Sequence, residues 1–140
     1  MSSSSDSQEI LERIHAALEA ARSVLNRFTP GAIGAEYKVG HDPVTEADRA
    51  VDDILRKTLL RAGDGWLSEE TVDDFTRLDK QRVWVVDPLD GTREFVHGIP
   101  EFCVSMAPAL PRPKLVGITP STLLIMIREP ITPAMRLRIC

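Results

Sequence analysis

The sequence has 140 residues, 43% of them hydrophobic, which is enough for one compact domain with a buried core and too short for two. The formal net charge is −4, and an acidic chain lacks the basic surface with which proteins bind nucleic acid or anionic lipid. Two cysteines do not make a disulfide framework, and residues 1–6 lack the basic and apolar regions of a signal peptide, so we expect a reducing cytoplasm. The longest apolar run, residues 123–127, is too short to span a bilayer.

The first thirty residues predict a disordered start followed by one amphipathic helix. Residues 1–7 are rich in serine, a composition typical of disorder. Residues 8–28 then carry apolar side chains at helical spacing, and Pro30 with Gly31 ends the pattern. The apolar positions are Ile10, Leu11, Ile14, Leu18, Ala21, Leu25 and Phe28.

A loop or hairpin is expected over residues 37–43, and a second helix begins after it. Thr45 and Asp48 have the spacing of a capping box, in which two side chains satisfy backbone amides at a helix start. The apolar stripe that follows reaches Leu59, before Ala62-Gly63. Capping alone would explain both Thr45 and Asp48.

Three later segments have the composition of strands. Residues 66–67 form a short apolar pair, and residues 71–81 after them are charged and predict a loop or a short helix. The continuous apolar run 83–86 predicts a buried strand that ends at the segment 87–92. Residues 102–107 predict a further strand.

The composition changes near residue 108. Residues 108–140 hold six of the ten prolines, five basic residues and a single acid, Glu129, so this tail has a net charge of +4 and the rest of the chain −8. Prolines remove backbone donors and interrupt strands. We therefore expect a domain over residues 8–107 and an atypical proline-rich, basic tail over 108–140 that does not complete its sheet.

The strongest chemical signal is Asp87-Pro-Leu-Asp-Gly-Thr92, directly after the predicted buried strand. Two carboxylates three residues apart, in a turn imposed by Pro88 and Gly91, can converge on one point, and hard divalent cations bind such oxygens. An ordinary Asp/Pro/Gly turn has the same composition, and spacing alone favours neither interpretation. Glu69 and Glu70 also follow an apolar stretch, where a solvated acidic pair is the simpler interpretation.

Three motifs together resemble the inositol monophosphatase superfamily in order, spacing and flanking residues. They are Asp42-Pro-Val-Thr-Glu-Ala-Asp48, Trp66-Leu-Ser-Glu-Glu70 and Trp84-Val-Val-Asp-Pro-Leu-Asp-Gly-Thr-Arg-Glu-Phe95. The resemblance covers residues 8–107. It implies an α+β fold with helices packed on a mostly antiparallel sheet, which would be the front half of the family's layered αβαβα architecture.

The branch of the superfamily is indicated by residues around the same motifs. Leu67-Ser-Glu-Glu70 and Arg93-Glu-Phe95 are most similar to the 3′(2′),5′-bisphosphate nucleotidase branch. Phe95-Val-His-Gly-Ile-Pro100 is more similar to inositol monophosphatase or histidinol-phosphate phosphatase. The implied substrate is a small phosphorylated metabolite, with adenosine 3′,5′-bisphosphate and its sulfated relative favoured and an inositol or histidinol phosphate as the alternatives.

The resemblance implies a Mg²⁺-dependent phosphomonoesterase that uses two or three ions. Carried over residue by residue, the metal ligands are the carboxylates of Glu69, Asp87 and Asp90 and the backbone carbonyl of Leu89. Paired ions of this kind can stabilise the attacking and leaving oxygens of an in-line displacement. No nucleic-acid polymer and no membrane is implied as a partner, and homodimer formation is open for full-length relatives.

The catalytic roles also follow from the resemblance. Glu69 and Thr92 would hold the attacking water, and Asp48 would accept a hydrogen bond from the Thr92 hydroxyl. Lys38 is a candidate neighbour of a third ion or of the substrate. The predicted phosphate-binding residues are Asp90, Gly91 and Thr92.

The resemblance also raises the alternative that this chain is not an active enzyme. Superfamily members are longer, and their second half supplies a further metal aspartate in a Trp-Asp element that has no counterpart after Ala107. A truncated or frameshifted, catalytically inactive remnant would have this sequence. Under that hypothesis the isolated chain is poorly soluble, binds hydrophobic dyes and hydrolyses nothing.

Overall fold

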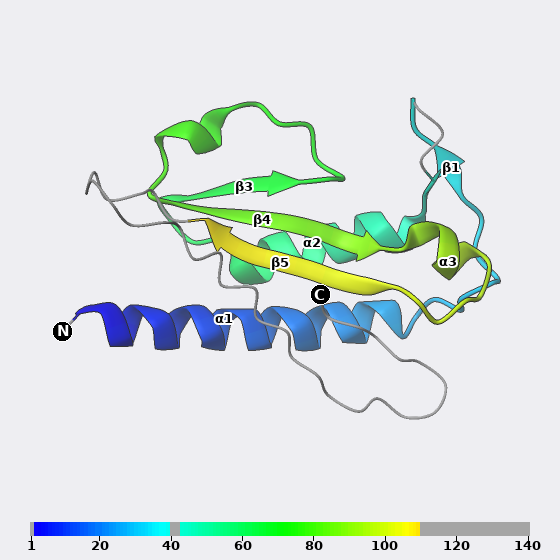
Figure 1. The fold of residues 1–140 in the computed structure, drawn as a ribbon, viewed down its shortest axis with the longest axis horizontal. Coiled ribbons are helices and arrows are strands. Elements are labelled where there is room, and N and C mark those ends of the chain that lie inside the picture. The colour runs from blue at the N-terminus through cyan, green and yellow to red at the C-terminus, as the bar shows by residue number, and fades with distance from the viewer. Residues whose placement is uncertain (1, 40–42, 110–140) are drawn as a thin grey trace, which may run out of the picture.

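A computed structural model describes residues 2–39 and 43–109 (Figure 1). The described residues contain a short antiparallel hairpin, as expected, and a separate three-stranded sheet. In chain order the elements are α1 (Ser2–Leu25), β1 (Glu36–Tyr37), β2 (Pro43–Val44), α2 (Glu46–Leu59), β3 (Asp64–Ser68), a 3₁₀ turn η1 (Thr76–Asp79), β4 (Arg82–Asp90), α3 (Thr92–Val96) and β5 (Cys103–Ala109).

Strand β4 is the centre of the larger sheet. It pairs with β3 in parallel and with β5 antiparallel, so two of the three strand pairings in the described residues are antiparallel. The predicted α+β class with a mostly antiparallel sheet is confirmed. Because β3 and β4 run in the same direction, Ser68 lies opposite Val86, and the residues that follow both strands meet at one edge of the sheet.

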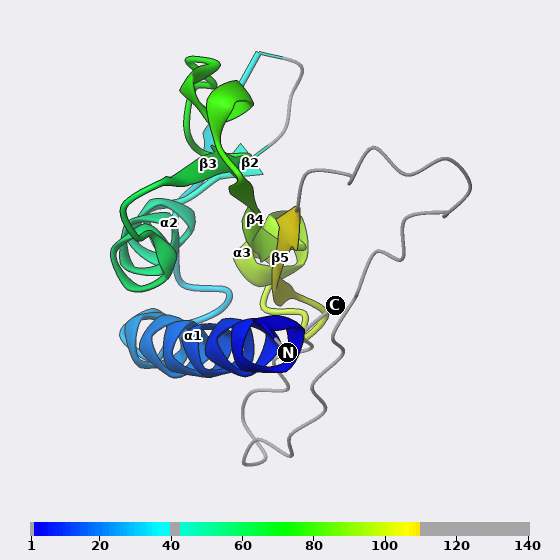
Figure 2. The ribbon, with the colours of Figure 1, turned by 90° about the vertical axis from the view of Figure 1, so that its left-hand side faces the viewer.

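Helices α1 and α2 lie on the same side of this sheet (Figure 2). The buried side chains of α1 repeat at helical spacing, which is the pattern that predicted the helix. Trp84 is completely buried between the helices and the sheet, whereas its neighbour Val85 points to the opposite face and is 42% exposed. The core residues of the helices are Ile14, Ala17, Leu18, Ala21, Leu25, Ala47, Val51, Leu55 and Leu59.

The first helix differs from its prediction at both ends. Helix α1 begins at Ser2, within the segment 1–7 that was expected to be disordered. Extending an existing helix adds one backbone hydrogen bond per residue at little cost, so the serine-rich segment can continue the helix. At the other end the helix stops at Leu25 rather than residue 28, where tighter bonds such as Phe28 N to Leu25 O (3.0 Å) close the last turn.

Two strands are longer than predicted. Strand β4 continues to Asp90, because Asp87 pairs with Ser105 and Asp90 with Cys103 around an irregularity that takes up the residues between them. Strand β5 continues past the predicted boundary at residue 107, with Pro108 opposite Trp84. The strand thus takes in the first two residues of the segment predicted as a tail, and the remainder of that segment, residues 110–140, lies outside the described part of the chain. Within the described part, none of the helices has the length and apolar character needed to cross a membrane.

Candidate functional site

The parallel pairing of β3 and β4 brings the predicted ligands to one pocket of about 320 Å³. Glu69 directly follows β3, and its amide donates to the carbonyl of Val86 in β4 (3.2 Å). Asp87 is the next residue of β4, so the two acids come from adjacent strands at the same edge. The pocket is lined by Pro43, Glu69, Asp87, Leu89, Asp90, Gly91, Thr92, Arg93 and Glu94, which include every predicted metal ligand and phosphate-binding residue.

The pKa of Asp87 is raised by its surroundings in this pocket. Partial burial raises the pKa of Asp87, and the carboxylates of Glu69 and Asp90 raise it further, to about 7. Like charges confined in one site hold a proton unless a cation neutralises them. An all-oxygen, negatively charged donor set of this kind fits a hard divalent cation such as Mg²⁺.

The carboxylates do not form a ready-made chelating cluster. Among residues 2–39 and 43–109, no three His, Cys, Asp or Glu side chains are arranged so that they could already hold a metal ion. The Glu69 side chain is 53% exposed, and its carboxylate lies 3.9 Å from the Lys38 ammonium. The convergence of Glu69, Asp87 and Asp90 on a common ion therefore stays a prediction.

Asp48 connects the start of α2 to the turn after β4. Its Oδ2 accepts from the Thr45 amide (2.8 Å) and hydroxyl, so the predicted capping box is present. Its Oδ1 lies 2.7 Å from the Thr92 hydroxyl, the contact that was predicted between these residues. The hydroxyl has one proton and also lies 2.8 Å from the Leu89 carbonyl, so it donates to one of the two acceptors at a time. Capping and the Thr92 contact thus use different oxygens of one buried carboxylate.

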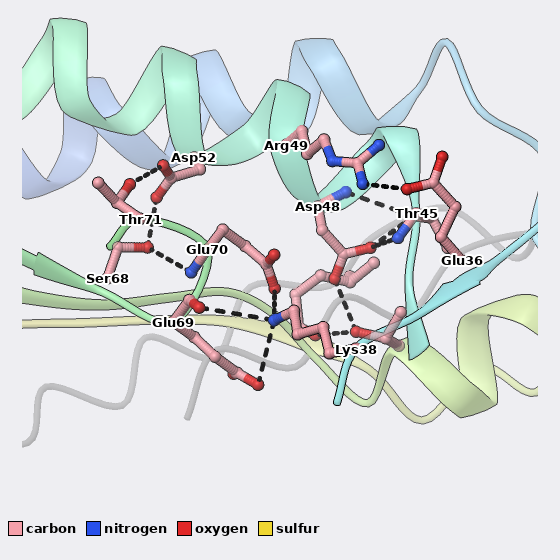
Figure 3. A network of polar contacts seen from close by, with 12 residues as sticks. Glu36, Lys38, Thr45, Asp48, Arg49, Asp52, Ser68, Glu69, Glu70 and Thr71 are labelled. Carbon is pink, nitrogen blue, oxygen red and sulfur yellow. Dashed lines mark hydrogen bonds and ion pairs between the residues drawn. The ribbon is translucent and has the colours of Figure 1, made fainter. Parts of the chain in front are cut away.

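Lys38 reaches the same region from the hairpin. Its ammonium lies 2.7 Å from Glu70 Oε1 and 3.5 Å from the Glu69 carbonyl (Figure 3). Burial lowers the pKa of Lys38, but the hydrogen bond to Glu70 and the attraction of the neighbouring acids outweigh it, so the pKa rises and the lysine stays charged. Lys38 is therefore beside Glu69 and Glu70, although it is not among the residues that line the pocket.

Three residues near the site were missed by sequence reasoning. Asp52, Ser68 and Thr71 are joined by hydrogen bonds beside Glu69 and Glu70 (Figure 3). A signal was available, because Asp52 lies four residues after Asp48, and residues four apart share one face of a helix.

Gly91 is required by the close approach of two backbone segments. Its φ of +90° lies in the left-handed region, and a Cβ there would lie 2.6 Å from the carbonyl oxygen of Glu101. Gly91→Ala should therefore lower the free energy of unfolding by at least about 1–3 kcal/mol, measured by chemical denaturation. Gly34→Ala is the matched control, because no atom lies within 4 Å of the added methyl. Equal stability of the two variants would contradict the close packing at Gly91.

Comparison with known proteins places the chain in a family. The sequence profile of the inositol monophosphatase family matches residues 6–119, so the chain belongs to that family. The match extends twelve residues beyond the resemblance found at residue 107, and it ends within the part of the chain that the structure does not describe.

Curated relatives carry three different phosphatase names. An inositol-1-monophosphatase from Mesorhizobium japonicum is 41% identical over 97 residues, which cover 67% of this chain and 36% of the relative. A histidinol-phosphatase from Mycobacterium tuberculosis is 45% identical over 80 residues (54% and 30%). A 3′-phosphoadenosine 5′-phosphate phosphatase from Mycobacterium bovis is 54% identical over 50 residues (34% and 19%). The chain thus spans about a third or less of the length of these relatives and corresponds to their N-terminal part.

Solved structures agree on the fold. The extragenic suppressor protein suhB from Bartonella henselae superposes with a TM-score of 0.62 at 32% identity, over 73% of this chain and 41% of that protein. The similarity therefore extends over most of the described residues.

Proposed function

We propose that this chain supplies the cation- and phosphate-binding part of a Mg²⁺-dependent phosphomonoesterase. The observation that carries the proposal is the pocket in which Glu69 and Asp90 help to raise the pKa of Asp87 to about 7. The ligands would be these three carboxylates and the Leu89 carbonyl. Bound Mg²⁺ would make a coordinated water more acidic and stabilise the charge that develops on the phosphate oxygens.

The chain's own residues would orient the attacking water. With the Thr92 proton donated to Asp48 at 2.7 Å, a lone pair of the Thr92 oxygen can accept a hydrogen bond from the water. The Glu69 carboxylate can accept the other proton. Amides at Gly91 and Thr92 are the proposed donors to the phosphate, and Lys38 is proposed to lie near a third ion or the substrate.

The proposed substrate is a 3′(2′),5′-bisphosphate nucleotide. The 54% identity to a 3′-phosphoadenosine 5′-phosphate phosphatase supports this choice, as does Arg93, a residue that lines the pocket. Guanidinium groups bind phosphates through paired hydrogen bonds, which suits a substrate with two phosphates. An inositol monophosphate is the alternative, supported by the longer match to the Mesorhizobium enzyme, and histidinol phosphate is the other.

The test is release of inorganic phosphate by the 140-residue chain from each of the three substrates while Mg²⁺ is titrated. We expect Mg²⁺-dependent release that is abolished in Asp90→Asn and retained in Asp53→Asn, a change at an exposed position of α2. Release that persists with a chelator or in Asp90→Asn would contradict the proposal.

An inactive remnant remains the hypothesis of a different class. It predicts that the chain binds Mg²⁺ weakly or folds poorly and releases phosphate from none of the substrates. A chimera then separates the two cases: residues 6–109 of this chain replace the corresponding segment of the Mesorhizobium relative. An active chimera would mean that these residues are competent and that the 140-residue chain lacks other parts of the enzyme. An inactive but folded chimera would contradict the proposed function.

The proposed setting is a reducing cytoplasm, in keeping with two cysteines in 140 residues. The proposed partner is the small phosphorylated substrate, and homodimer formation is proposed for full-length relatives alone.

Thr92→Ala should separate turnover from metal binding in a full-length relative that carries this sequence. Loss of the hydroxyl removes the contact to Asp48 and one acceptor for the water, and we expect turnover to fall by about 100-fold with little change in Mg²⁺ half-saturation. Thr92→Ser keeps the hydroxyl and is the control. Equal losses of turnover and Mg²⁺ affinity would mean that Thr92 is only structural.

A further inference from the structure

We propose that Asp52 is a positioning residue for the metal site, which holds the turn that carries Glu69 and Glu70. This inference rests on the proposed function. Asp52 lies on α2 and is only 6% exposed. Its Oδ1 accepts a hydrogen bond from the Ser68 hydroxyl, and its Oδ2 accepts one from the Thr71 hydroxyl at 2.7 Å (Figure 3). One carboxylate therefore binds the residues on both sides of the two glutamates.

The hydroxyl of Ser68 links Asp52 to the backbone of the turn. Besides donating to Asp52, it accepts a hydrogen bond from the Glu70 amide (3.2 Å). The neighbouring Glu69 amide is held independently by the Val86 carbonyl of β4 (3.2 Å). The backbone that carries the Glu69 side chain is thus fixed from β4 on one side and from α2 on the other.

The position of Asp52 on α2 links both halves of the pocket. Asp48 lies one turn earlier on the same helix and contacts Thr92, whereas Asp52 contacts the turn after β3. A single rigid helix therefore holds both the segment with Glu69 and the segment with Thr92. Sites held by residues on helices are more precise than sites held by loops alone, and residues that support metal ligands affect metal affinity without touching the ion.

Among residues 2–39 and 43–109, no basic side chain forms an ion pair with Asp52 that would explain its burial. The hydrogen bonds to its carboxylate in this part of the chain come from two hydroxyls. Burying a carboxylate is costly, and a neutral side chain would serve one hydroxyl at less cost. Two acceptor oxygens that hold two hydroxyls at once are what the turn requires.

The test measures Mn²⁺ affinity of the 140-residue chain by electron paramagnetic resonance of unbound Mn²⁺. Asp52→Ala should weaken binding by about 10–100-fold, the range found when supports of metal ligands are removed. Asp52→Asn and the isosteric Thr71→Val, each of which disturbs one of the two bonds, should weaken binding less. Asp53→Asn, at the adjacent exposed position, should bind as the unchanged chain does.

Two further variants make the outcome decisive. If Asp52 acts through Thr71, adding Thr71→Val to Asp52→Ala should weaken binding no further, whereas general loss of folding would make the two effects add. Glu69→Gln tests the metal site itself: if it leaves Mn²⁺ binding unchanged, the proposed function fails and this inference fails with it. If Glu69→Gln weakens binding while folded Asp52→Asn and Thr71→Val bind as tightly as the unchanged chain, the positioning role alone is overturned. Asp52→Asn and Thr71→Val also decide the question if Asp52→Ala does not fold.

Discussion

Replacing Arg13 by alanine should lower the free energy of unfolding by about 3–5 kcal/mol, because it breaks a buried ion pair and leaves the Asp64 carboxylate with only the more distant Arg82, at 3.7 Å, as a cationic partner among the described residues. Arg13 is 5% exposed and donates to the Asp64 carboxylate, whose side chain is 7% exposed, and to the Leu59 carbonyl. Its guanidinium also lies 5.1 Å from the ring centroid of Trp84. One side chain thus joins α1, the end of α2, β3 and β4.

Chemical denaturation of the purified chain would measure this effect. Arg22→Ala, on the same helix, removes a half-exposed arginine 3.9 Å from Glu19 and should change stability by less than about 1 kcal/mol. Adding Asp64→Asn to Arg13→Ala should recover part of the loss, because the carboxylate is no longer left without Arg13. Similar stabilities of Arg13→Ala and Arg22→Ala would contradict a structural role for the buried pair.

The same pair predicts a pH dependence. Burial raises the pKa of Asp64, but hydrogen bonds from Arg13 and Trp84 outweigh it, so the pKa lies below the ordinary value of an aspartate. A lowered pKa stabilises the fold above the unfolded-state pKa, and this contribution is lost as the pH falls through the folded-state pKa. The stability difference between the unchanged chain and Arg13→Ala should therefore shrink below about pH 4.

Asp87→Asn should weaken divalent-cation binding by more than about 100-fold, because it removes a proposed ligand rather than a support of one. Titration calorimetry with Mg²⁺ would measure the loss, and Asp53→Asn is the control. In the unchanged chain, a pKa of about 7 at Asp87 means that protons compete with the cation at lower pH, so affinity should fall as the pH drops below neutrality. Affinity that is independent of Asp87 would contradict the proposed ligand set.

In the metal-free chain, the raised pKa of Asp87 has the opposite pH effect on folding stability from the one it has on cation affinity. A raised pKa means that the folded state holds the Asp87 proton more tightly than the unfolded chain, so stability from this group declines as the pH rises from about 4 to about 7. Asp87→Asn should therefore stabilise the metal-free chain at pH 8 and have little effect near pH 3. Thermal unfolding with a chelator present would measure both.

Local signals predicted α1, α2 and most of the strands. The capping box of Thr45 and Asp48 depends on residues three apart, so the start of α2 could be located from the sequence. The length of β4 could not, because Asp90 belongs to the strand only through its pairing with Cys103 of β5, thirteen residues away. The helical start at Ser2 was missed because serine-rich composition indicates disorder even where an adjoining helix extends through it.

The site was predicted through motifs and not through geometry. Glu69 and Asp87 were grouped by resemblance, and it is the parallel pairing of β3 with β4 that brings them to one edge. Asp52 was missed because two adjacent acids on an amphipathic helix, Asp52 and Asp53, have the composition of a solvated face. Its burial becomes visible only once α2 is packed beside the turn with Ser68 and Thr71.

The most direct test of the central claim is paramagnetic broadening of amide NMR signals of the chain by substoichiometric Mn²⁺. If the pocket binds a divalent cation, the amide signals of residues 69, 87 and 89–92 should broaden first, and those of α1, on the far side of the core, should remain sharp. The order of broadening should be lost in Asp87→Asn. Broadening that begins elsewhere, that is uniform along the chain, or that is the same in Asp87→Asn would contradict a cation site formed by Glu69, Asp87 and Asp90.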